Sequence, residues 1–82
     1  MPKVFEEAGI VARVYPQDHY PAHVHVETGN HTGRICIDGT VRVIGKTTLT
    51  SRELKKALVL VQRYQQRCLA VWEAIHGESS SR

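Results

Sequence analysis

Three of the five histidines in this chain of 82 residues lie within one short stretch, at positions 19, 23 and 25. Imidazole groups exchange protons near neutral pH and are common metal ligands, so this stretch is the first candidate for chemistry. From Ala22 to Glu27, small or apolar residues alternate with polar ones, which is typical of a strand with one buried and one open face. We therefore expect His23, His25 and Glu27 to share the open face.

One chemistry that this face could perform is metal-independent cleavage of RNA. His23 or His25 together with Glu27 would act as general acid and base. Arginines expected on the same face would stabilise phosphate charge: Arg13, Arg34 and Arg42. The competing interpretation is an ordinary polar face, because an open antiparallel sheet carries polar cross-strand pairs in any case. No spacing in the chain is diagnostic of a nuclease.

A second chemistry is metal binding. His23 and His25 are spaced so that two imidazoles on one strand face could meet one ion, and His19 completes the predicted metal set. Zinc or nickel would suit such ligands. Asp38, Cys36 and His31 are further candidates for the coordination shell. The first expectation is a protein without a cofactor, and the metal site is its alternative.

A binding role needs fewer residues. Basic side chains follow one another along the C-terminal half, where they could contact RNA phosphates or an acidic protein: Lys46, Arg52, Lys55, Lys56, Arg63 and Arg67. The net charge of +3 and the pI of about 9.1 agree with an anionic partner but also with an ordinary solvated surface. We single out Lys55 and Lys56 as candidate RNA contacts.

The polar face must be positioned by a small sheet. Alternating patterns bounded by glycine, proline and asparagine predict four or five strands, at residues 4–7, 10–15, 22–27, 34–38 and 41–44. Residues 28–33 have the composition of a turn. A register that is symmetric about this turn predicts three cross-strand pairs: Glu27 with Arg34, His25 with Cys36, and His23 with Asp38.

One long helix is predicted after the sheet. Thr50 and Glu53 form a capping-box pattern, so we expect the helix to begin at residue 51 and to continue to about residue 76. Its apolar stripe is interrupted at Gln65. At about 1.5 Å per residue the helix would be about 39 Å long, roughly twice the length of a short strand. Part of its apolar side should therefore pack on another chain, with Trp72, Tyr64 and Ile75 as interface residues, or the helix should bend.

The resulting fold class is α+β, an antiparallel meander of four or five strands with one long C-terminal helix packed on one face. Residues 1–77 form a single domain and residues 78–82 a disordered tail. With 41% hydrophobic residues the chain can form a core. Its two cysteines indicate no disulfide framework, and no apolar run is long enough to cross a bilayer, so we expect a cytoplasmic protein.

The chain also resembles a known family of small bacterial proteins, domain of unknown function 4160. The resemblance covers nearly the whole chain and rests on residues 1–7, Gly9-Ile10, Tyr15-Pro16, Asp18-His19, Pro21-Ala22-His23-Val24-His25-Val26, and Ile35, Ile37, Asp38 and Val41. Members typically carry Pro-Pro-His-x-His, and this chain has Ala22 in place of the second proline.

The resemblance implies a site at Asp18, His19, His23 and His25, although the family has no established activity. It further implies a two-gene arrangement similar to toxin–antitoxin modules. We therefore expect a cytosolic interaction protein that engages the small protein encoded by a neighbouring gene, with RNA as a further candidate ligand. A homodimer through the C-terminal helix is a further expectation, and ribonuclease activity and metal binding are the alternatives.

Overall fold

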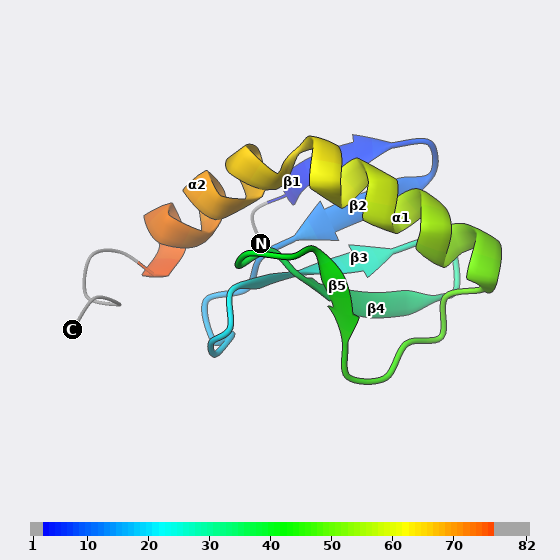
Figure 1. The fold of residues 1–82 in the computed structure, drawn as a ribbon, viewed down its shortest axis with the longest axis horizontal. Helices are drawn as coiled ribbons and strands as arrows, with labels where there is room; N and C mark the ends of the chain where they lie inside the picture. Colours follow the sequence, from blue (N-terminus) through cyan, green and yellow to red (C-terminus); the bar gives the residue numbers. More distant parts are fainter. Residues whose placement is uncertain (1–2, 77–82) are drawn as a thin grey trace.

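The computed structural model describes residues 3–76, which form a sheet layer and a helix layer (Figure 1). The sheet is a five-stranded antiparallel meander, β1-β2-β3-β4-β5. Its strands are β1 (Lys3–Glu7), β2 (Ile10–Arg13), β3 (His23–Glu27), β4 (Thr32–Cys36) and β5 (Arg42–Ile44), and its helices are α1 (Ser51–Arg63) and α2 (Gln65–His76). The predicted α+β fold is confirmed. The tail predicted at residues 78–82 lies outside the described residues.

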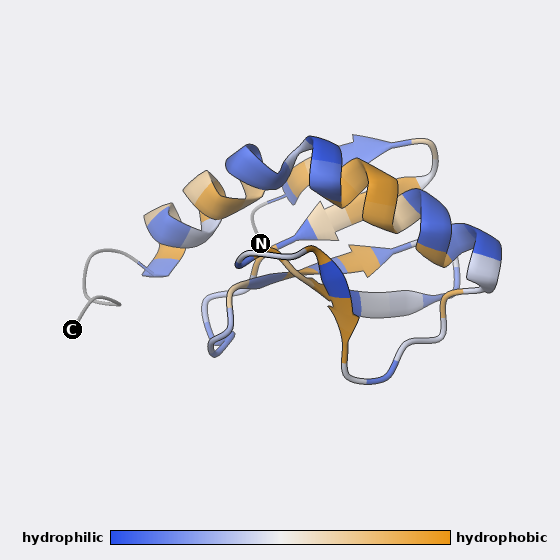
Figure 2. Ribbon diagram, viewed as in Figure 1, coloured by the Kyte–Doolittle hydropathy of each residue, from blue (hydrophilic) through white to orange (hydrophobic). Residues whose placement is uncertain are grey.

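The core lies between the sheet and the helices. On the sheet side, alternate residues of three strands are fully buried, including Ala12, Val24 and Ile35. On the helix side, Ala57 and Val61 are also fully buried, as their spacing of four residues on one helix face requires. Figure 2 shows the hydrophobic residues of α1 in its middle turns and hydrophilic residues toward its two ends. The side of β3 that carries His23 and His25 is opposite the side that packs in this core.

The predicted register between β3 and β4 is wrong by two residues. In the structure His25 lies opposite Arg34, and His23 lies opposite Cys36. The cause is a tighter turn, closed by a hydrogen bond from the Thr28 N–H to the His31 carbonyl (2.9 Å), so that β4 begins at Thr32. A shift of two residues leaves every side chain on its predicted face, because the side-chain period of a strand is two.

The single predicted helix is divided at Tyr64. Its backbone (φ −103°, ψ 20°) leaves the helical conformation, and α2 begins at Gln65, the residue that interrupts the apolar stripe. Side chains at the break form hydrogen bonds to β1 and to the connection between β4 and β5. Tyr64 donates to Glu7 Oε1, and Gln65 Nε2 donates to the carbonyls of Ile37 (2.8 Å) and Gly39 (2.9 Å). The structure therefore has two shorter helices in place of the single predicted one.

The predicted capping box is present at the start of α1. Thr50 Oγ1 accepts from the Glu53 N–H, and Glu53 Oε1 accepts from the Thr50 N–H. Within residues 3–76, neither helix is long and apolar enough to span a membrane.

Candidate functional site

The connection between β2 and β3 brings a carboxylate to the two histidines of β3. Asp18 is fixed by a reciprocal pair of hydrogen bonds with Tyr15: the Tyr15 N–H donates to Asp18 Oδ2 (3.1 Å), and the Asp18 N–H donates to the Tyr15 carbonyl (3.1 Å). From α2, His76 Nε2 lies 3.2 Å from the Asp18 carbonyl oxygen. The loop is thus held both by its own turn and by the second helix.

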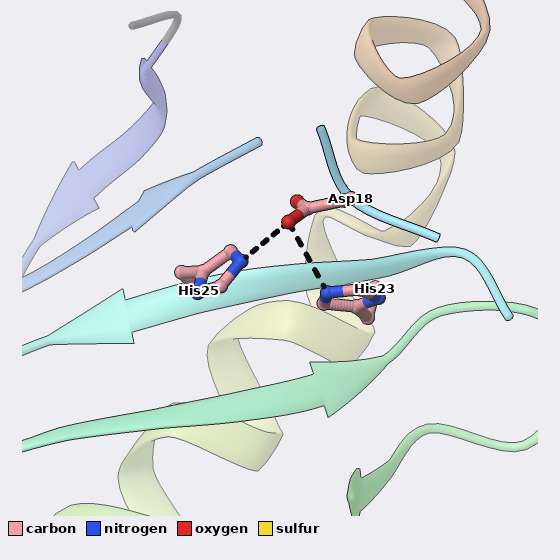
Figure 3. A group of neighbouring side chains, drawn as sticks. All are labelled: Asp18, His23 and His25. Carbon is pink, nitrogen blue, oxygen red and sulfur yellow. Dashed lines mark hydrogen bonds and ion pairs between the residues drawn. The ribbon is translucent and has the colours of Figure 1, made fainter. Parts of the chain in front are cut away.

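Asp18, His23 and His25 form a compact cluster (Figure 3). Asp18 Oδ1 lies 2.9 Å from His25 Nε2 and 3.7 Å from His23 Nε2. One ligand atom from each of the three residues lies within 4.8 Å of the other two. The His23 side chain is 6% exposed and the Asp18 side chain 11%, while His25 is more open at 28%. These are three potential metal ligands at a partly buried position.

The backbone fixes the position of one ring hydrogen of His23. Its Nδ1 lies 2.8 Å from the Pro21 carbonyl oxygen, and a carbonyl can only accept, so Nδ1 carries a hydrogen. In the neutral ring, Nε2 then holds a lone pair, and this atom is the one that lies 3.7 Å from Asp18 Oδ1. A lone pair this close to a carboxylate oxygen is favourable only with a proton or a cation between them.

Asp18 is ionised at neutral pH. Burial of the side chain opposes ionisation, but the hydrogen bonds from His25 and from the Tyr15 N–H outweigh it, with help from the charges of the two histidines. Together they hold the pKa of Asp18 below its ordinary value. The cluster therefore offers a carboxylate, the form that ligates metal ions.

Aromatic rings surround the cluster. Tyr15 meets His25 edge-on, with ring centroids 4.6 Å apart, and Trp72 lies 5.6 Å from the His23 ring. Trp72 also stacks on His76 at 3.9 Å. These contacts restrict the orientations of both histidines and so pre-position their ring nitrogens.

The structure brings only part of each predicted set together. His23 and His25 are in the cluster, whereas His19 is exposed and the third group is Asp18. Glu27 lies at the far end of β3, where its Oε1 is 3.9 Å from Arg13 Nε. Among the candidate ligands, Asp18 was indicated only by the family resemblance, because nothing in the strand pattern places a loop residue over the sheet.

The predicted phosphate contacts are dispersed. Arg34 is exposed and borders the histidine cluster, but Arg42 Nη1 donates to the Thr40 carbonyl (3.1 Å). On α1, Lys56 Nζ donates to the Ala8 carbonyl (3.1 Å), and Lys55 is exposed. Arg34 therefore borders the cluster, whereas Arg13, whose Cα lies opposite that of His25, is beside Glu27.

The predicted interface residues and Cys36 are all wholly or partly buried in the structure. Trp72, predicted at an interface, is 2% exposed within the single chain, and Tyr64 and Ile75 are half-buried against the same core. Cys36, predicted on the open polar face, is fully buried beside His23, where its Sγ lies 3.6 Å from the Asp38 carbonyl. The strand pattern assigns Cys36 to the correct face, because it lies opposite His23, but it does not show that this part of the face is buried.

The fold and cluster define a class of protein: a small α+β domain with an Asp-His-His group at one end of an antiparallel sheet. The chain belongs to the family described as Domain of unknown function (DUF4160), whose family model matches residues 9–73. This segment contains all three cluster residues. No curated protein and no solved structure shows a significant match to the chain.

Proposed function

We propose that this protein binds one divalent transition-metal ion through Asp18 Oδ1, His23 Nε2 and His25 Nε2. One observation carries the proposal: the Pro21 carbonyl holds the hydrogen of His23 on Nδ1, which leaves the Nε2 lone pair facing an ionised carboxylate. A metal ion between these atoms would bond to both of them in place of a proton, and it would also displace the hydrogen that His25 Nε2 shares with Asp18 Oδ1. A ligating histidine commonly donates its other ring N–H to a carbonyl in this way.

The dimensions of the cluster fit this role. Zinc bonds to histidine nitrogen and carboxylate oxygen are about 2.0–2.2 Å long, so two ligand atoms of a tetrahedral site lie about 3.3 Å apart. The two distances from Asp18 Oδ1, 2.9 and 3.7 Å, fall on either side of this value. All three atoms lie within 4.8 Å of one another, so the two histidine nitrogens would move toward each other when an ion binds.

Two imidazoles and one carboxylate suit zinc, nickel or iron(II), with zinc and nickel the ions predicted from the sequence. A site with three protein ligands leaves a position open for water or another ligand, as in catalytic zinc sites. An ion held there would act as a Lewis acid and lower the pKa of a bound water.

Metal retention tests the proposal. The purified protein is loaded with zinc, dialysed against metal-free buffer and measured by elemental analysis. We expect about one zinc per chain in the wild type, and loss of that zinc in Asp18→Asn and in His25→Ala. Asp18→Asn is nearly isosteric, and circular dichroism checks that each variant is folded.

Two matched histidine variants sharpen this test. His31 forms a similar imidazole–carboxylate pair, with Nδ1 2.9 Å from Glu53 Oε1, but it has no second imidazole beside it. We expect His31→Ala and His19→Ala to retain zinc. A wild type that loses all zinc on dialysis would refute the proposal, and zinc loss in His19→Ala would favour the ligand set predicted from the sequence.

A second candidate function is binding of a small acidic protein encoded by a neighbouring gene. The observation that favours it is the outer face of α1, where Val59 is 56% exposed and is flanked by the exposed residues Arg52, Lys55 and Lys56. An apolar centre with a basic surround suits an acidic partner. Binding of RNA and a homodimer through the C-terminal helix stay predictions.

Co-expression with the neighbouring gene product tests this second candidate. The complex should form with the wild type and be lost in a Val59→Glu, Lys55→Glu double variant. A complex that is unaffected by the double variant, or a wild type that stays free of the partner, would rule out this surface.

A further inference from the structure

We propose that the pocket beside the Asp18, His23 and His25 cluster binds a small oxyanion, a carboxylate or a phosphate, and that Arg34 recognises it. This inference rests on the proposed metal site and names the class of ligand that such a site would take. It concerns binding, and the residues that support it lie on three different strands and one loop.

The first support is the position of the pocket. It has a volume of about 210 Å³ and is lined by loop residues 17–21, by His23 and His25 of β3, by Arg34 of β4 and by Ile44 of β5. All three proposed metal ligands therefore border the same space as Arg34. A molecule in this pocket could contact both an ion held by the cluster and the guanidinium group.

The second support is the way in which the sheet holds Arg34. Its Cα lies opposite that of His25 on β3 and opposite that of Ile44 on β5. The guanidinium group lies against Gly45, where a Cβ atom would collide with Arg34 Nη2. Gly45 also has a φ of +70°, a conformation that favours glycine. The turn after β5 thus leaves room for the guanidinium group at the pocket.

The third support is that Arg34 lacks a counter-charge. Among residues 3–76, no hydrogen bond or ion pair occupies its guanidinium group, whereas Arg13 lies beside Glu27 and Arg63 pairs with Glu7. Asp18, the carboxylate that borders the same pocket, is engaged with His25. Arg34 is therefore available for a ligand, and its planar fork matches the two oxygens of a carboxylate or phosphate.

The net charge of the site with a metal ion bound also favours an anionic ligand. A divalent ion and one carboxylate ligand leave a net charge of about +1 at the cluster, and Arg34 adds a second positive charge at the pocket. A monoanionic or dianionic ligand would neutralise this charge, with one oxygen on the metal and another on the guanidinium group. A neutral ligand of the same size would gain neither interaction.

Cobalt(II) provides the test, because its visible absorption reports a change of ligand. Cobalt-loaded wild type is titrated with inorganic phosphate, with acetate and with neutral acetamide. We expect phosphate or acetate, and not acetamide, to change the spectrum. The Arg34→Gln variant should bind the anion about tenfold or more weakly than the wild type. Its affinity for cobalt should be unchanged. The matched control is Arg42→Gln, on the neighbouring strand, which should behave as the wild type.

Each outcome bears on a different claim. Response to phosphate alone or acetate alone supports the inference and identifies the oxyanion. If cobalt binds but neither anion changes the spectrum, or if Arg34→Gln binds the anion as tightly as the wild type, the inference is refuted and the metal site stands. If cobalt binds to the cluster variants as tightly as to the wild type, or does not bind at all, the metal site itself fails and the inference fails with it.

Discussion

At the scale of single residues, a histidine's neighbours decide what it can do. His25 and His31 both lie 2.9 Å from a carboxylate oxygen, so an isolated pair distance does not distinguish them. What sets the cluster apart is His23, whose ring is oriented by the Pro21 carbonyl and directs a second nitrogen at the same carboxylate. Two imidazoles that converge on one carboxylate make a potential metal site, and one imidazole makes an ordinary ion pair.

The two buried cysteines lead to the first prediction. Burial raises the pKa of the Cys68 thiol to about 11, with the charge of Arg67 opposing the shift only weakly. Since the thiolate is the reactive form, Cys68 should not react with a thiol reagent at pH 8 in the folded protein. Cys36 is equally buried. We expect negligible modification by Ellman's reagent until denaturant is added, after which two thiols per chain should react.

Fast modification of Cys68 in the native protein would contradict this packing. Cys68→Ser would serve as the control, because it leaves Cys36 as the only thiol. Cys68 lies seven residues after Val61 and four before Trp72, so helical spacing places it on the same buried side of the helix layer. The strand pattern assigns Cys36 to a face but does not show which part of that face is buried.

The three proposed metal ligands also show that the strand pattern predicts a face but not the path of a loop. The alternation from residue 22 to residue 27 correctly places His23 and His25 on one face, since a strand has only two faces. The third ligand depends on the path of the loop between Pro16 and Pro21. Asp18 rather than His19 turns inward because of its two hydrogen bonds with the Tyr15 backbone, and no periodicity encodes such a turn.

At the scale of secondary structure elements, local chemistry was easier to predict than pairing. The start of α1 follows from a capping box, a pattern that depends on residues only three apart. The register of β3 with β4 depends on the turn, and two registers that differ by two residues bury the same side chains. The tight turn that joins Thr28 to His31 selects the observed register.

The capping box leads to a prediction about pH. A hydrogen bond from the Thr50 N–H, opposed by burial and aided by His31, lowers the pKa of Glu53 below its ordinary value of 4.5. Because the folded pKa is the lower one, this carboxylate stabilises the fold above about pH 4.5 and loses its effect as the pH falls through the folded pKa. Glu53→Gln should therefore be less stable than the wild type at pH 7, with a difference that shrinks toward pH 3.

Urea unfolding between pH 3 and pH 7 measures this difference. Thr50→Ala removes the other half of the box and should cost about 1 kcal/mol at pH 7. A Glu53→Gln difference that stays constant over this pH range would show that the Glu53 charge does not contribute to capping.

At the scale of the whole molecule, the helix layer is longer than the strands it covers. The molecule measures 38 × 21 × 21 Å, and α2 extends along its long axis beyond the sheet (Figure 1). The sequence predicts a helix too long for the sheet, which would either pack on another chain or bend. The break at Tyr64 corresponds to the second of these outcomes. Trp72 anchors α2 to the start of β3, and His76 reaches the loop that carries Asp18. The second helix therefore helps to hold the Asp18, His23 and His25 cluster together.

A domain of this size has a small core, so a bound metal should add measurably to its stability. At a free zinc concentration 100 times its dissociation constant, the free energy of unfolding should rise by about 2.7 kcal/mol. Thermal unfolding with and without zinc measures this rise. His31→Ala should show the same increase, and Asp18→Asn should show none. Equal stabilisation of the wild type and Asp18→Asn would place zinc elsewhere.

The most direct test of the metal site is a crystal structure of the zinc-loaded protein with anomalous diffraction measured at the zinc edge. We expect one strong peak per chain, about 2.0–2.2 Å from Asp18 Oδ1, His23 Nε2 and His25 Nε2. The His23 Nδ1 hydrogen bond to the Pro21 carbonyl should be retained. A peak at His31 and Glu53, or the absence of any peak at the cluster, would contradict the proposed function.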